Sequence, residues 1–235
     1  MRTIIENRLQ ASARLSPVNT GILAIHWQND IVLPTGAFGP IFADSVRQTG
    51  ALVHAAHAVR EARRLGAQVF HVLAAYHPSF QGHVANNALF RTVQHRHAFV
   101  RGTEGVAACA EMRPEGDDIV VEHGRISAFY GTDLSAQLRA AGVVNLAVTG
   151  VATNVAVDLT IREAVQEGFN TYLLEDCCCS STPAYHDAAM MTMAALSSHV
   201  MQHDQFLALL VQGSTPGMGG MTGPKLYNEG LEPST

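Results

Sequence analysis

Short apolar runs rich in β-branched residues alternate along this chain with stretches of helical periodicity, and this alternation limits the folds open to it. The apolar runs occupy residues 21–26, 67–73, 118–122, 143–149 and 171–175. The helical stretches occupy residues 44–65, 133–141, 154–167 and 183–200. Strands that alternate with helices of this length form βαβ units. The five runs therefore predict an α/β fold, a three-layer Rossmann-like α/β/α domain with a mainly parallel sheet of five or six strands.

The composition fits a globular core and argues against several classes of partner. Hydrophobic residues make up 47% of the 235 residues and charged residues 15%. The formal net charge is −5 with no basic block, so we expect no nucleic-acid partner and no membrane surface. No apolar run reaches the roughly 20 residues that span a bilayer. The N-terminal residues carry charges without the apolar stretch of a secretory signal, so a cytoplasmic location is expected.

Both ends of the chain differ from its middle. We predict one domain over residues 20–212, an N-terminal arm over 1–19, and a flexible or partner-packed tail over 213–235 that is rich in Gly, Pro, Ser and Thr. Arms that cannot pack alone often cross to a neighbouring subunit, so we expect a homo-oligomer.

Polar residues gather where the predicted strands end, and in an open parallel sheet ligands bind beyond those carboxyl ends. The residues at these ends are His26, Gln28, Asp30, Glu122, His123, Arg125 and Asn154. Cys177 follows the last strand, but three adjacent cysteines after a buried strand are more often small core residues than nucleophiles. The four cysteines also lack a disulfide or zinc pattern. We therefore interpret Cys177 as a packing residue.

Three motifs in order resemble the isochorismatase-like (cysteine hydrolase) superfamily. ILAIHWQND resembles its D-x-Q-x-D after the first strand, and RISAFYGTDL resembles R-x-S-A-F-x-x-T-x-L. VTGVATNVAVDLTIREAVQEGF resembles G-V-x-T-x-x-C-V-x-x-T-x-x-A-x-x-x-G. The resemblance covers roughly residues 21 to 180 and implies a small-molecule hydrolase that forms dimers or tetramers.

The family's amidases use an Asp–Lys–Cys triad, and this chain resembles them with all three residues replaced. The Asp position falls on His26, the Lys position on His123, and the Cys position on Ala156. Without a thiol at Ala156 the family's acyl-transfer mechanism cannot run there. Isochorismatases proper also have a small residue in place of the Cys, but they keep the Asp.

The rest of the family pattern implies a substrate pocket. It includes a cis peptide bond, here Val151–Ala152, that directs the backbone N–H groups of Ala152 and Ala156 at a substrate oxygen. The substrate-binding residues that the resemblance implies are Gln28, Asp30, Arg125, Ser127, Phe129, Val151, Ala152, Asn154 and Ala156.

Several alternatives stay open at the catalytic positions. His26 is expected to act as a general acid or base, because imidazole titrates near neutral pH, although a hydrogen-bonded histidine filling a vacated site is the rival interpretation. His123 and Glu122 compete for the second position, since adjacent strand residues face opposite sides. We expect no cofactor and no metal. His77 and His83 resemble the family's metal-binding histidines, but Ala75 stands where the pattern has an Asp.

The leading hypothesis is an isochorismatase-family hydrolase with a rewired site. It acts on a small carbonyl, amide or enol-ether metabolite by non-covalent acid/base catalysis through His26, with His123 or Glu122. A second hypothesis is a catalytically silent member that binds a metabolite or serves as an assembly subunit. A third is metal-assisted hydrolysis through His26, His77, His83 or His123.

Overall fold

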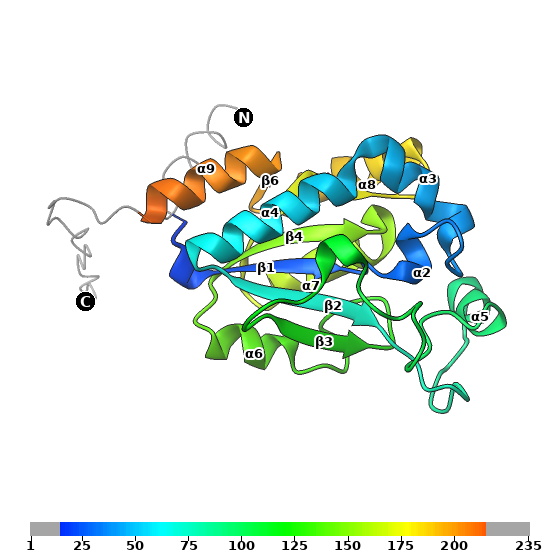
Figure 1. Ribbon diagram of the computed structural model, residues 1–235. Coiled ribbons are helices and arrows are strands. Elements are labelled where there is room, and N and C mark those ends of the chain that lie inside the picture. Colours follow the sequence, from blue (N-terminus) through cyan, green and yellow to red (C-terminus); the bar gives the residue numbers. More distant parts are fainter. Residues whose placement is uncertain (1–14, 215–235) are drawn as a thin grey trace, which may run out of the picture.

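A single six-stranded sheet, with all of its strands parallel, organises the described chain (Figure 1). The structure is a computed structural model that describes residues 15–214. The strand order is β3-β2-β1-β4-β5-β6. The strands are β1 (Thr20–Ile25), β2 (Gln68–Ala74), β3 (Ile119–His123), β4 (Asn145–Val151), β5 (Asn170–Cys179) and β6 (His199–Met201). The predicted α/β fold with five or six parallel strands is confirmed.

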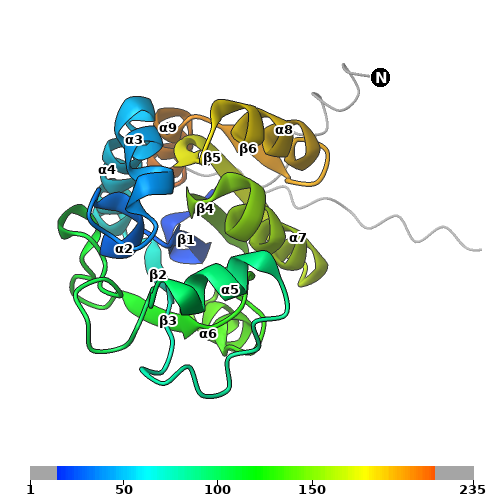
Figure 2. The same ribbon diagram turned by 90° about the vertical axis from the view of Figure 1, so that its right-hand side faces the viewer.

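Helices cover both faces of this sheet and make the outer layers. They are α2 (Asn29–Val32), α3 (Gly39–Thr49), α4 (Ala51–Leu65), α5 (Ala88–His95), α6 (Leu134–Ala140), α7 (Asp158–Gln166), α8 (Pro183–Met193) and α9 (His203–Ser214). Short turns of helix are η1 (Pro17–Asn19), η2 (Ala110–Met112) and η3 (Thr153–Val157). Figure 2 shows α3, α4 and α9 on one face and α6, α7 and α8 on the other. None of the described helices combines the length and hydropathy that a bilayer-spanning segment needs.

Two predicted helices differ from the observed ones. The stretch 44–65 is divided at Gly50, whose φ of 69° ends α3 and begins α4. A positive φ suits glycine because it has no Cβ, and it redirects the chain between the two helices. The stretch 183–200 ends earlier, at Met193, and its last residues belong to β6. The apolar pattern alone does not mark either boundary.

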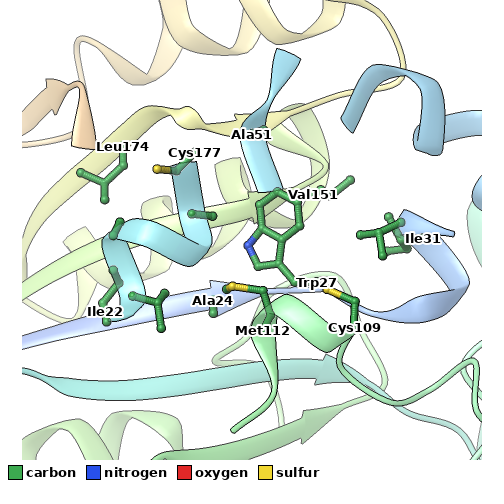
Figure 3. Packing of buried hydrophobic residues seen from close by; sticks show 14 of the residues in the cluster. Ile22, Ala24, Trp27, Ile31, Ala51, Cys109, Met112, Val151, Leu174 and Cys177 are labelled. Atoms are coloured by element: carbon green, nitrogen blue, oxygen red, sulfur yellow. The ribbon is translucent and has the colours of Figure 1, made fainter. Parts of the chain in front are cut away.

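Two apolar clusters, one on each face of the sheet, form the core. Every residue of β1 is buried, as expected for a central strand covered on both faces. Trp27 anchors one cluster, with the sulfur atoms of Met112 and Cys109 close to its indole ring (Figure 3). Cys177 belongs to the same cluster and is fully buried, and burial raises the pKa of its thiol. This environment agrees with the packing interpretation.

The described residues extend slightly beyond the predicted domain at both ends. Leu15 is buried in the core, and its carbonyl lies so close to Gly213 that a Cβ there would clash. Helix α9 continues to Ser214, into the stretch assigned to the tail. The rest of the predicted arm (1–14) and tail (215–235) lies outside the described residues. The homo-oligomer stays a prediction.

Candidate active site

The carboxyl ends of β1 and β4 meet where the strand order reverses, which is the usual ligand position in open α/β sheets. His26 follows β1 directly, and His123 is the last residue of β3. Between them β2 ends at Ala74, the register partner of His123. Because Ala74 carries only a methyl group, the two imidazole rings can meet across the end of β2.

His26 and His123 form a buried, hydrogen-bonded pair. Their Nε2 atoms are 2.6 Å apart, and the ring centroids are 4.8 Å apart with the ring planes inclined by 20°, so the two rings meet edge to edge. His26 Nδ1 lies 3.1 Å from the carbonyl oxygen of Val151, and His123 Nδ1 lies 3.0 Å from that of Ser127. A carbonyl oxygen only accepts, so each of these two contacts needs a hydrogen on the imidazole nitrogen.

The pair in its neutral form has fewer hydrogens than contacts. Two neutral imidazoles supply two N–H groups for three contacts, so one contact lacks its hydrogen. A single added proton completes all three. Burial lowers the pKa of His123 to about 4, and burial and the neighbouring His123 lower the pKa of His26 well below its usual value. The pair is therefore neutral at pH 7 and arranged to accept one proton.

The backbone at His26 is itself unusual. Its φ of 57° lies in the left-handed region, which non-glycine residues rarely adopt. Its N–H donates to the carbonyl oxygen of Val72 at 2.9 Å, which fixes this turn against β2. Such conformations concentrate at functional sites because the surrounding structure must hold them in place.

A mostly apolar cavity of about 80 Å³ borders His26, while His123 lies behind it and does not line the cavity. It is smaller than the roughly 150 Å³ engineered cavity that binds benzene, which favours a small ligand. Helix α5 covers this end of the sheet. The cavity lining includes His26, Phe38, Tyr76, Phe90, Phe99, Arg125, Ala152 and Ala156.

Comparison with known proteins identifies the family of this chain. Residues 20–205 match the family model described as the isochorismatase domain. The chain belongs to the isochorismatase family. It is 31% identical over 171 residues to the uncharacterized isochorismatase family protein YddQ of Bacillus subtilis, covering 72% of this chain and 83% of that protein.

Two further proteins are similar to this chain. Ureidoacrylate amidohydrolase RutB of Rhizobium rhizogenes is 28% identical over 175 residues, covering 69% of this chain and 71% of that protein. The crystal structure of a cysteine hydrolase from Pseudomonas syringae pv. phaseolicola superposes with a TM-score of 0.76 at 21% identity, covering 86% of this chain and 97% of that one. At that identity, the superposition supports the fold alone.

The three positions that the sequence resemblance assigned to the triad lie near one another in this isochorismatase-family protein. His26 contacts His123, and Ala156 lines the same cavity as His26. Glu122, the alternative to His123, lies elsewhere, because its half-exposed carboxylate accepts from Arg101 Nε at 2.6 Å. The strand alternation therefore places the histidine, and not the carboxylate, toward His26. The expected cis bond is present at Val151–Ala152.

Gln28 and Asp30 hold the protein's own backbone, although the sequence suggested that they bind substrate. The Gln28 amide is fully buried and bonds both polar backbone atoms of Ala74. Asp30 Oδ1 accepts from Ala37 N at 3.0 Å, and Oδ2 accepts from Phe99 N at 2.6 Å. Both side chains position the walls of the cavity.

Three other expected binding residues also lie outside the cavity lining. The Ser127 hydroxyl donates to Glu163 and accepts from Phe129 N. The Phe129 ring stacks on Phe169. Asn154 is exposed and accepts from the Ser180 hydroxyl at 2.5 Å. Ser127 and Phe129 belong to the second family motif and Asn154 to the third, but their side chains face other partners.

Two polar groups complete the cavity lining, and one of them was missed by sequence reasoning. Arg125 packs its guanidinium 4.1 Å from the centroid of the Phe90 ring and donates to the carbonyl oxygen of Val84. Tyr76 follows β2, and burial raises its pKa to about 12, so its phenol stays protonated and can donate. Its place at a strand end was the signal that could have identified it.

The histidines considered as metal ligands do not join the pair. His77 is exposed, and its Nδ1 lies 2.8 Å from the Ser79 hydroxyl. His83 Nε2 donates to the carbonyl oxygen of Phe90 at 3.1 Å. A catalytic metal held by these residues together with His26 and His123 has no support in this geometry.

Removing the Asp30 carboxylate should loosen both cavity loops. In Asp30→Ala the amides of Ala37 and Phe99 lose their acceptor, and we expect a loss of about 1–3 kcal/mol in unfolding free energy for each amide left buried and unpaired. Urea denaturation measures the loss, and amide hydrogen exchange should accelerate in residues 33–39 and 97–101. Asp44→Ala is the control, because that carboxylate is 85% exposed. Equal stability of the two variants would contradict the tethering role.

Proposed function

We propose that this isochorismatase-family protein hydrolyses a small amide, or another small carbonyl or enol-ether compound, without a covalent enzyme intermediate. The observation that carries the proposal is the His26–His123 pair, whose neutral form has three hydrogen-bonding contacts and two hydrogens. A buried pair with room for one more proton is suited to act as a general base.

On an amide, we propose a hydrolysis in which water is the nucleophile. A water molecule displaces one of the two protein contacts of the His26 ring and bonds to that nitrogen. The water oxygen attacks the carbonyl carbon, a C–O bond forms, and the water proton passes to the histidine pair. The carbonyl π electrons move to the oxygen, where backbone N–H groups of Ala152 and Ala156 are proposed to stabilise the charge. Collapse of this intermediate breaks the C–N bond, and the leaving nitrogen takes the proton back from the pair.

The cavity lining supports a small and partly apolar substrate. Phe38, Phe90 and Phe99 offer apolar contact, while Arg125 and Tyr76 offer hydrogen-bond donors on one side. A guanidinium and a protonated phenol together suit a carboxylate or carbonyl oxygen. The similarity to a ureidoacrylate amidohydrolase supports amides and ureides that carry a carboxylate as the first class to test.

The test is a substrate screen, followed by intact-mass spectrometry of the protein during turnover. Small amides, ureides and enol ethers are incubated with the purified protein, and product is followed by mass spectrometry. We expect turnover of at least one compound and no added mass on the intact protein after an acid quench. A substrate fragment attached to the protein and lost in Cys177→Ala would overturn the non-covalent route.

A silent binding protein is the second candidate, and a specific observation favours it. Both ring nitrogens of His26 already contact protein atoms, so a substrate or water must displace one of these contacts. In a silent member the pair would keep both contacts. Binding of a screened compound in calorimetry, with no product even at high protein concentration, would support this candidate against the hydrolase.

A further inference from the structure

A second cluster of titratable side chains lies away from the cavity, between α4, β5 and the start of α9. It consists of His54, Asp176 and His203, whose potential ligand atoms all lie within 4.8 Å of one another. None of the three lines the cavity at His26. Figure 2 shows the helices that carry the histidines, α4 and α9, next to each other on one face of the sheet.

The sheet register explains why two of these residues meet. Strands β5 and β6 are parallel, and Leu174 pairs with Met201. Asp176 and His203 each come two residues later, so they lie side by side. In the same region β5 departs from its register with β4, between the pairs Val148–Leu173 and Gly150–Cys178. This irregularity lets Asp176 leave the regular ladder with β4 and face the helices.

The contacts hold the carboxylate in an orientation suited to a ligand. Asp176 Oδ1 accepts from the backbone N–H of His203 at 2.9 Å, which fixes the group. Asp176 Oδ2 lies 2.5 Å from His203 Nδ1 and 3.7 Å from His54 Nδ1. His54 Nδ1 also lies 3.2 Å from the backbone carbonyl oxygen of Asp176, and this contact must be given up when the nitrogen binds a metal. Ligand atoms around a tetrahedral Zn²⁺ at about 2.0–2.1 Å are about 3.4 Å apart. Reaching that spacing requires the His203 contact to open from 2.5 Å and the His54 side chain to move closer from 3.7 Å.

The surroundings also provide for access and a further ligand. The His54 side chain is 41% exposed, whereas those of Asp176 and His203 are 13% and 16% exposed, so the cluster opens to solvent on the side of α4. The ring of His57, one turn after His54 on α4, lies edge-on to His203 with centroids 5.2 Å apart. His57 is not part of the ligand group, so water can supply the fourth position from the solvent side.

We propose that His54, Asp176 and His203 bind one Zn²⁺ ion at a structural site that joins α4, β5 and α9. Two imidazoles and one carboxylate are typical zinc ligands. The same donors also suit Fe²⁺, but the order of affinities among divalent ions places zinc above iron. Mg²⁺ prefers oxygen ligands and should not compete. By joining three elements, the ion would stabilise the docking of α9.

The experiment uses the full chain without a histidine tag, stripped of metal with a chelator and then dialysed. Calorimetric titration with Zn²⁺ should show one site per chain, and Co²⁺ should give the visible absorption of a tetrahedral site. Zn²⁺ should also raise the thermal unfolding midpoint. Parallel titrations with Mg²⁺, and with Fe²⁺ under anaerobic conditions, should show no binding and weaker binding than Zn²⁺, respectively.

Variants locate the site. His54→Ala and His203→Ala should each weaken Zn²⁺ binding by at least about a hundredfold, the upper end for loss of an outer-shell partner. His95→Ala, an exposed histidine on α5, should bind like the wild type. His54→Ala changes a half-exposed position on a helix, so circular dichroism should show it folded. The absence of stoichiometric Zn²⁺ binding, or unchanged binding in folded His54→Ala, would overturn the proposal.

Discussion

Replacing His26 with alanine should lower turnover by about 10²–10⁴-fold, the usual contribution of a positioned general base. The variant removes two of the three contacts in the histidine chain, so His123 alone no longer has a path for the proton. The measurement is kcat and KM on a compound found in the screen. Because the side chain is only 9% exposed, circular dichroism must first show that the variant is folded.

His123→Ala and Glu122→Gln complete this comparison. We expect His123→Ala to lose turnover as His26→Ala does, because each ring holds the other in place. Glu122→Gln should behave like the wild type, since its carboxylate is paired with Arg101 at the surface. Full turnover in a folded His26→Ala would disprove the general-base role.

The pH profile gives an independent check on the pair. A general base must be unprotonated to act, and burial lowers the pKa of both histidines, with that of His123 near 4. The value of kcat/KM should therefore stay level as the pH falls below the ordinary histidine pKa of about 6.5, and should decline only toward pH 4. A decline centred near 6.5 would indicate that the catalytic base is a solvent-exposed histidine.

Restoring the family's three residues together should create a cysteine amidase activity that no single change produces. A cysteine is reactive as a thiolate, which needs a proton acceptor and a nearby positive charge. In Ala156→Cys alone, the buried neutral histidines supply no charge at pH 7. The triple variant that adds His26→Asp and His123→Lys supplies both groups, and its amide turnover should exceed that of the single variant by about 10²-fold or more.

The matched test is intact-mass analysis of both variants after an acid quench. The triple variant should carry an acyl group from the substrate, and Ala156→Cys should carry little or none. Equal turnover by the two would show that the histidine pair already activates a thiol at this position, and the assignment of these residues to the triad would then need revision.

The fold was readable from the sequence because it rests on local periodicity, whereas much of the site rests on contacts between distant residues. The resemblance brought His26 and His123 to one site, although 97 positions separate them. It gave no sign that Gln28 and Asp30 bond backbone atoms 46 and 69 positions away. Their types fit substrate binding and tethering equally well, and only the packed chain distinguishes these roles.

Strand β6 was not predicted from the sequence for a related reason. Strand β6 has three residues, and pairing with β5, not its own sequence, makes it a strand. The Asp176–His203 contact depends on that pairing, so it could not be predicted from the sequence either. Tyr76 lies outside the three family motifs, so the resemblance did not point to it, although it follows the end of a strand.

The hydrogen bonds that Asp30 accepts from two loops affect how the sequence of this protein can vary. The Asp30 carboxylate accepts hydrogen bonds from the backbone amides of Ala37 and Phe99 and does not bond their side chains. Substitutions in either loop therefore leave the anchor intact, while neighbours such as Phe38 and Phe99 decide what the cavity admits. Natural selection, or selection from a library of variants, can therefore change the residues that line the cavity while His26 and His123 stay in place. The side chains of the two loops can therefore vary while the Asp30 carboxylate continues to hold the loop backbones.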